Sequence, residues 1–307
     1  MKDNLIRNSY VNSFDVDDSD LKSLIIINTK CLVDDITQRY VYIDNNRLKD
    51  ELRYFNYYGT KPSYDDILNI LLPLILANTN IQKSEDEVVS LIQKYIKYLK
   101  KEDKLFEYIL GGVIYNALLH VLIDNKNIEY GDLLQSLKEK LIGFSIELEK
   151  LNMIKFQMAR INAIQLIDSY IDLKVDDYEE GKIIRNILNV IYDIYIEERE
   201  VNNAGIISIK KSILSILGEE ANKNMDNIDF IEQMSVYILK IRKYMINKKT
   251  YNLNSDPRNL IKYNEGDTVL DAILNKINIV SKELKDNILY IKIKSKSGEY
   301  DFKFKRA

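Results

Sequence analysis

The stretch LFEYILGGVIYNALLHVLI, residues Leu105–Ile123, is apolar around nearly its whole circumference when it is drawn as an α-helix. A helix of this kind is either buried in a protein core or crosses a membrane. Glu107, Asn116 and His120 interrupt it, whereas a spanning segment needs about 18 apolar residues with few or no charges. The stretch therefore predicts the central helix of a core, and we expect no membrane insertion.

Apolar residues recur at helical spacing on both sides of this stretch, from Leu21 to about residue 246. The chain of 307 residues contains only 3 Pro and 10 Gly, which favours long helices over many tight β turns. We predict a mainly α fold, a multi-helix bundle over residues 19–246, whose first helix runs from Leu21 to Ile43. The polar and acidic residues 1–18 predict a flexible N-terminus.

The period of the apolar residues changes from 3.6 to 2 near the C-terminus. Residues 247–264 are rich in Asn and predict a linker or long loop, followed by a small α+β element over residues 265–307 that starts with a short helix at 268–274. The alternation then predicts a small antiparallel β-hairpin with its turn at Ser297-Gly298, or a three-stranded meander if Ile277–Ser281 adds a strand. The apolar positions that alternate are Leu289, Ile291, Ile293, Tyr300, Phe302 and Phe304.

The composition excludes several classes of site. The chain has one His and one Cys, so it cannot build a multi-histidine metal centre, a cysteine-based zinc site or an intrachain disulfide. It contains neither a Walker A loop nor a Gly-rich dinucleotide fingerprint. The cofactor stays unknown, because nothing in the sequence points to a nucleotide, haem, zinc or an iron–sulfur cluster, and no metal ligand is assigned. A reducing, cytoplasmic location fits the single cysteine.

Polar residues spaced by four form a seam on the predicted central helix. Asn116, His120 and Asp124 lie on one face, and a histidine there is a candidate acid or base near neutral pH. The same pattern also fits a hydrogen-bonded histidine inside a bundle, with Asp124 ending the helix. The three residues are candidate catalytic residues, and both interpretations stay open at this point.

Two further groups are candidate binding residues. If the first helix reaches Ile43, Asn28, Asp35 and Arg39 share one edge of its apolar face, where they could hold a phosphate or a metal, or form a boundary salt bridge. Arg160 falls within an apolar stripe of its own helix. A buried guanidinium needs an anionic partner, so we expect a carboxylate or a ligand within hydrogen-bond reach of Arg160, unless its side chain extends to solvent from the edge of the stripe.

Charge is distributed unevenly along the chain. From Lys282 to the end there are eight Lys or Arg and four Asp or Glu residues, whereas the rest of the chain holds 36 and 43. Lysines beside an aromatic residue on the outer face of the hairpin can bind nucleic acid, but they also protect exposed sheet edges from aggregation. The candidate nucleic-acid residues are Tyr290, Lys292, Lys294, Lys303 and Lys305.

The pattern as a whole favours a non-catalytic protein-interaction or scaffold protein, whose partner we expect to be another protein. The first alternative is a helical enzyme, a hydrolase that uses carboxylates and a divalent metal on a phosphorylated or nucleotide substrate. The second is weak nucleic-acid binding through the basic C-terminal hairpin. The sequence does not determine the oligomeric state.

Overall fold

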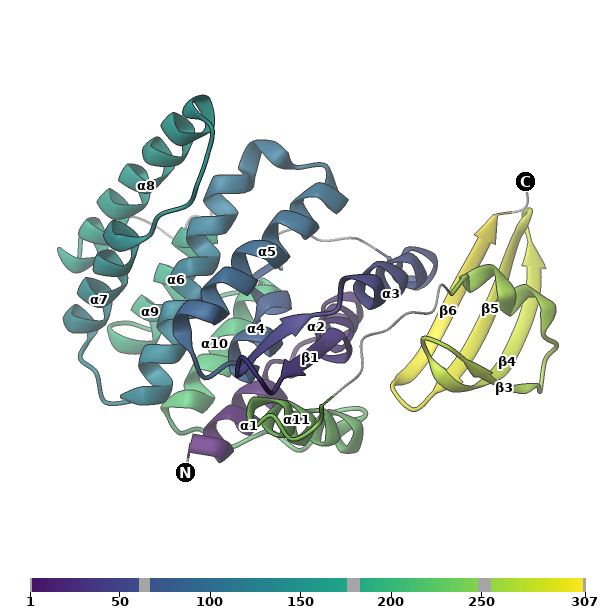
Figure 1. Ribbon diagram of the computed structural model, residues 1–307. Helices are drawn as coiled ribbons and strands as arrows, with labels where there is room; N and C mark the ends of the chain where they lie inside the picture. The colour runs from purple at the N-terminus through teal and green to yellow at the C-terminus, as the bar shows by residue number, and fades with distance from the viewer. Residues whose placement is uncertain (1, 61–66, 176–182, 248–254, 306–307) are drawn as a thin grey trace.

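The computed structural model describes residues 2–60, 67–175, 183–247 and 255–305. A helical body fills most of the molecule, and a four-stranded antiparallel sheet lies to one side of it, beside helix α3 (Figure 1). The predicted mainly α fold is confirmed. The helices of the body are α1 (Lys2–Asn12), α2 (Ser19–Cys31), α3 (Asn45–Tyr58), α4 (Ile67–Ala77), α5 (Ile81–Leu99), η1 (Glu102–Lys104), α6 (Leu105–Asp124), α7 (Tyr130–Gly143), α8 (Lys150–Ile171), α9 (Ile183–Tyr195), α10 (Ala204–Leu217) and α11 (Ile228–Arg242).

Helix α6 occupies the centre of the body and contacts α4, α5, α7, α8 and α9. Two glycines allow this close packing. A Cβ atom on Gly111 would lie 2.0 Å from Ile183 Cγ2, and one on Gly112 would lie 2.4 Å from Ile92 Cδ1. The neighbouring helices therefore occupy the volume that larger side chains would need. Even so, α6 is not the most completely buried helix, because every residue of α4 is buried.

The apolar character of this region is also sufficient for a membrane span. Within the described part of the chain, Glu102–Asp124 is the one helical segment that is long and apolar enough to cross a bilayer, but 83% of its apolar window is buried inside the protein. Burial of this kind is typical of the core helix of a soluble protein.

The prediction of a flexible N-terminus is wrong for the described residues. Residues Lys2–Asn12 form α1, which packs against α10 and α11. Tyr10 and Phe14 are almost completely buried, and the Tyr10 hydroxyl lies 2.9 Å from Thr29 Oγ1. The few apolar residues of this polar segment are sufficient to hold it in place, because α10 and α11, which come much later in the chain, pack against them.

The predicted first helix is too long. Helix α2 ends at Cys31, and the chain then forms a short antiparallel hairpin of β1 (Leu32–Asp35) and β2 (Tyr40–Ile43). Arg39 adopts a left-handed backbone conformation with φ of 54°, which ends the turn of this hairpin. The β-branched and aromatic residues of β2 suit a strand, and α5 and α11 cover them. Strands are therefore not confined to the C-terminal region.

The C-terminal sheet is larger than predicted. Its strands β3 (Thr268–Asp271), β4 (Asn275–Lys285), β5 (Ile288–Ser295) and β6 (Gly298–Lys305) pair antiparallel in sequence order. A four-stranded meander thus replaces the predicted hairpin or three-stranded sheet, and the predicted short helix at 268–274 is wrong, because Thr268–Asp271 is a strand. The predicted turn at Ser297-Gly298 is one residue late: Lys296 and Ser297 form the turn, and Gly298, with a φ of 140°, begins β6.

The sheet packs on α3 through its apolar face. Tyr54, Leu260, Phe302 and neighbouring apolar residues form a core of their own, separate from the main core of the body. The Tyr54 hydroxyl donates to Asp271 Oδ2 at 2.9 Å and lies 2.7 Å from Ser255 Oγ. Of the predicted linker 247–264, residues 248–254 lie outside the described residues, and Pro257–Lys262 form the short helix η2, which carries Leu260 into this core.

Candidate functional site

The polar seam on α6 is part of the core. Asn116 is completely buried; its Oδ1 accepts a hydrogen bond from Ser84 Oγ at 2.6 Å and its Nδ2 donates to the carbonyl of Ile81 at 3.2 Å. Asp124 is exposed and pairs with Lys2 at 2.7 Å. Burial, reinforced by the charge of Arg242, lowers the pKa of His120 to about 4, so this histidine is neutral at physiological pH.

The candidate binding residues do not converge. Asn28 is buried and donates to the carbonyl of Leu24 and to the Tyr95 hydroxyl, both at 2.8 Å. Asp35 lies in the β1–β2 hairpin and accepts a hydrogen bond from the backbone of Gln38. Arg39 is exposed, and its guanidinium lies 5.8 Å from the centre of the Tyr244 ring. The i,i+4 pairing expected of Asp35 and Arg39 is lost because this segment is not helical.

The expected anionic partner of Arg160 is absent among the described residues. Its guanidinium donates to the carbonyl of Phe144 at 2.9 Å, to the carbonyl of Ile142 at 3.4 Å and to Gln157 Oε1 at 2.6 Å. It also lies over the Phe156 ring at 5.6 Å. The half-buried guanidinium of Arg160 therefore finds its hydrogen-bond acceptors in backbone carbonyls and an amide oxygen. These bonds hold the α7–α8 connection against α8.

The lysines of the C-terminal sheet share their face with acidic residues. Cross-strand pairing places Lys292 opposite Asp301 and Lys294 opposite Glu299. Lys292 also pairs with Glu299 at 3.0 Å. Tyr290, Lys303 and Lys305 lie on the same face, with Lys303 opposite Tyr290. Because the acids alternate with the lysines, this surface is much less positive than a count of lysines alone indicates.

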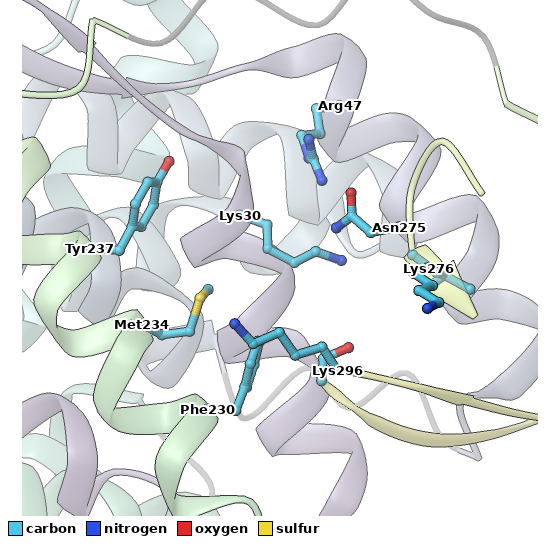
Figure 2. A pocket seen from close by; sticks show the side chains of 10 residues that line it. Lys30, Arg47, Phe230, Met234, Tyr237, Asn275, Lys276 and Lys296 are labelled. Atoms are coloured by element: carbon cyan, nitrogen blue, oxygen red, sulfur yellow. The ribbon is translucent and has the colours of Figure 1, made fainter. Parts of the chain in front are cut away.

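A cleft between the helical body and the sheet collects functional groups that are far apart in the sequence (Figure 2). Its cavity volume is about 480 Å³, which lies within the range of small-molecule sites. Helix α11 provides one side, α2 and α3 provide the second, and two turns of the sheet close the third. We call it the interface cleft; its lining residues are Lys30, Arg47, Phe230, Met234, Tyr237, Leu274, Asn275, Lys276, Lys296 and Ser297.

Four of these side chains are cationic, and none of the described lining residues is acidic. Behind the lining, the buried carboxylate of Glu51 pairs with Lys30 at 2.8 Å and with Arg47 at 3.2 Å. One carboxylate thus offsets two cations and holds them in place. Lys276 and Lys296 add two more positive charges from the sheet, so the cleft and its immediate support carry a net charge of about +3 by this count.

The turns of the sheet place these two lysines by local sequence rules. Asp271 Oδ1 accepts hydrogen bonds from the backbone N–H groups of Ile273 and Leu274 at 2.8 and 2.9 Å, which forms the turn between β3 and β4. Asn275 then adopts a left-handed conformation with φ of 61° and directs the chain to Lys276. Lys296 lies in the β5–β6 turn and donates to Gln233 Oε1 of α11 at 2.6 Å.

The side of the cleft formed by α11 is apolar. Phe230, Met234 and Tyr237 are spaced by four and three residues and therefore lie on one face of the helix, and Figure 2 shows them opposite Lys30, Arg47 and Lys276. The Tyr237 hydroxyl donates to the carbonyl of Leu32 at 3.2 Å. Burial raises the pKa of Tyr237 well above its usual range, so it is a neutral phenol. Three cations thus face the apolar side chains of α11 across the cleft, whereas Lys296 lies on the α11 side, where it donates to Gln233.

No protein-family model, curated protein or solved structure matches this chain. Among the residues that the structure describes, no group of three or more His, Cys, Asp or Glu side chains is arranged to hold a metal ion.

Sequence reasoning missed the interface cleft entirely. Lys30, Arg47, Lys276 and Lys296 each look like an ordinary surface residue of a charged helix or turn, and 266 positions separate the first from the last. The one available signal was the apolar spacing of Phe230, Met234 and Tyr237, but that spacing is equally typical of a helix face in a core.

Proposed function

We propose that this protein is a non-catalytic binding protein that takes an anionic small molecule into the interface cleft, in a reducing compartment such as the cytoplasm. The observation that carries the proposal is the convergence of four cations from three separate parts of the fold around a concave, partly apolar cavity. Charge-assisted hydrogen bonds from Lys and Arg to phosphate or carboxylate are strong, and a concave site screens them less than a flat surface does.

The test uses inorganic pyrophosphate and the temperature of thermal unfolding. Ligand that binds only the folded protein raises the unfolding midpoint with concentration. We expect this rise in the wild type, its loss in the Lys276→Gln/Lys296→Gln variant, and its suppression by high salt. Both replaced lysines are exposed, so the variant should fold.

The matched control is Lys303→Gln/Lys305→Gln. It removes the same charge from the same sheet, toward the end of β6 about 20 Å from the Lys296 turn by strand length. The control should respond to pyrophosphate as the wild type does. Equal responses of the two double variants would mean that the anion binds the surface without using the cleft, and would contradict the proposal.

A second candidate function rests on α8, where four large apolar side chains are more than half exposed: Leu151 77%, Ile154 53%, Met158 62% and Ile161 53%. Their spacing of three, four and three residues forms one stripe, opposite the buried face that holds Phe156. Such a stripe is typical of a surface that packs against another helix. We propose that it docks an amphipathic helix of a partner protein.

The charges beside this stripe indicate the partner's chemistry. At 100° per residue, the exposed Lys150 and Lys155 fall on opposite edges of the stripe, so a partner helix with acidic flanks fits best. A labelled model peptide with Leu at the same spacing and Glu at the flanks should bind, and its counterpart with Lys at the flanks should not. Met158→Glu should abolish binding; equal binding of both peptides, or of neither, would contradict this proposal.

A further inference from the structure

The interface cleft has a cationic side and an apolar side, and a simple anion can contact only the cationic one. Its cationic side is formed by Lys30, Arg47 and Lys276, while Phe230, Met234 and Tyr237 form the facing apolar side (Figure 2). A ligand that satisfies both sides must carry a charged group at one end and a flat or apolar group at the other. Inorganic phosphate or pyrophosphate satisfies only the first side.

We propose that the ligand of the interface cleft is a nucleoside diphosphate, held with its pyrophosphate on the cations and its base against Phe230 and Tyr237. This inference rests on the proposed anion-binding function and narrows it to a ligand class. The ring faces of aromatic side chains stack on bases without regard to sequence, and Met234 supplies a polarizable surface between the two rings.

The charge of the site selects the number of phosphates. Over the whole cleft, including Lys296 on the α11 side, four cations and the carboxylate of Glu51 give a net charge of about +3. A nucleoside diphosphate carries about −3 at neutral pH, because a terminal phosphate is close to −2 and an inner one is −1. A nucleoside monophosphate leaves positive charge uncompensated. A long-chain carboxylate, which also has an apolar part, supplies only one negative charge.

The size of the site favours a single nucleotide over a nucleic-acid strand as its ligand. A cavity of about 480 Å³ is closed on three sides by α11, by α2 with α3, and by the turns that carry Lys276 and Lys296. The lysine-bearing face of the sheet does not extend the positive surface, because Glu299 and Asp301 lie among its lysines. Within residues 255–305, the sheet therefore does not continue the positive surface of the cleft as a basic track, which favours one nucleotide over a strand.

Isothermal titration with ADP, GDP, AMP, adenosine and pyrophosphate tests the inference, with EDTA present so that no divalent cation contributes. We expect ADP and GDP to bind with similar affinity, because stacking does not distinguish the bases. Each should bind at least about tenfold more tightly than AMP, adenosine or pyrophosphate, since each of these lacks one of the two groups.

Two variants separate the contribution of the ring from that of the charges. Phe230→Leu keeps an apolar side chain but removes the ring, and should weaken ADP binding about tenfold while leaving pyrophosphate affinity unchanged. Lys276→Gln/Lys296→Gln should weaken both ligands. Phe230 is half-buried on the surface of α11, and circular dichroism of each variant confirms that it is folded.

The possible outcomes distinguish the inference from the function on which it rests. If pyrophosphate binds as tightly as ADP, and Phe230→Leu affects neither, the nucleoside diphosphate assignment is wrong while anion binding stands. If no anion binds, both are wrong. If a short oligonucleotide binds more tightly than ADP, the ligand is nucleic acid and the assignment also fails.

Discussion

The two adjacent glycines of α6 allow a quantitative test of how the helical body packs. Alanine in place of glycine inside a helix is favourable by about 1 kcal/mol from backbone propensity alone, whereas forcing a methyl group into a filled core costs about 1 to 3 kcal/mol. Gly111, Gly112 and Gly131 all lie in helices, and they differ in what a methyl group would meet.

At Gly111 the new methyl group would lie 2.0 Å from Cγ2 of Ile183 and 3.4 Å from its Cβ. Cγ2 is bonded directly to the branched Cβ, so it can move only if χ1 rotates or α9 shifts. At Gly112 the nearest atom, 2.4 Å away, is the terminal Cδ1 of Ile92, which can rotate about χ2, and the next are Val88 Cγ1 at 3.0 Å and Leu71 Cδ1 at 3.3 Å, which need to move by only a few tenths of an ångström. At Gly131 nothing lies within 4 Å.

The expected order of stability follows from these contacts. Gly111→Ala should lower the free energy of unfolding by about 2 kcal/mol, Gly112→Ala should change it by less than about 1 kcal/mol, and Gly131→Ala should raise it by up to about 1 kcal/mol. Guanidinium unfolding monitored by far-ultraviolet circular dichroism measures all three against the wild type.

A double variant tests the assigned cause. Ile183→Ala removes Cγ2, so Gly111→Ala should cost at least about 1 kcal/mol less in the Ile183→Ala background than in the wild type. If Gly111→Ala proves as stable as Gly131→Ala, or if its cost is unchanged in that background, α6 and α9 do not pack at this glycine as the structure shows.

The remaining predictions concern single interactions. The pKa of His120 is about 4 in the folded state and about 6.5 in the unfolded chain, so the unfolded chain binds the proton first as the pH falls. The free energy of unfolding should therefore be at its full value above pH 6.5 and decrease by about 3 kcal/mol as the pH drops to 4. The His120→Gln variant should lack this decrease when unfolding is measured as a function of pH. Tyr54→Phe removes the hydroxyl that contacts Ser255 and Asp271, and it should lower the free energy of unfolding by about 1 to 3 kcal/mol. Hydrogen exchange in β3 should become faster, and unchanged exchange there would contradict this role of Tyr54. Arg160→Met should destabilise by about 1 kcal/mol, because the carbonyl of Phe144 loses its donor in a part-buried hydrogen bond, and retention of full stability would show that water replaces it. Lys303→Gln/Lys305→Gln should leave the retention of DNA and RNA in a filter-binding titration at background, as in the wild type, because acids lie among the lysines of that face.

Local patterns in the sequence were sufficient for the secondary structure over most of the chain. The nearly unbroken apolar circumference of Leu105–Ile123 predicts α6 as a core helix, because a helix that is apolar on all sides is stable in water only when other elements cover it. The alternation at Leu289, Ile291 and Ile293 likewise fixes β5. The failures at residues 2–12 and 32–43 have one cause. In both segments, distant elements supply the burial that decides the conformation, and α10 and α11 cover α1 whereas α5 and α11 cover the small hairpin.

The interface cleft was decided by tertiary structure alone. The sequence contained the lysines and the apolar spacing on α11, but Lys30 and Lys296 approach each other only because Tyr54 and its neighbours on α3 hold the sheet against the body. Side chains at such separations have no local pattern that marks them as neighbours. The sequence by itself thus determined most of the helices and the strands β5 and β6, since their own apolar patterns show which face each must bury. The site required the packing of one folded unit on another, because only that contact brings separate cations around a shared cavity.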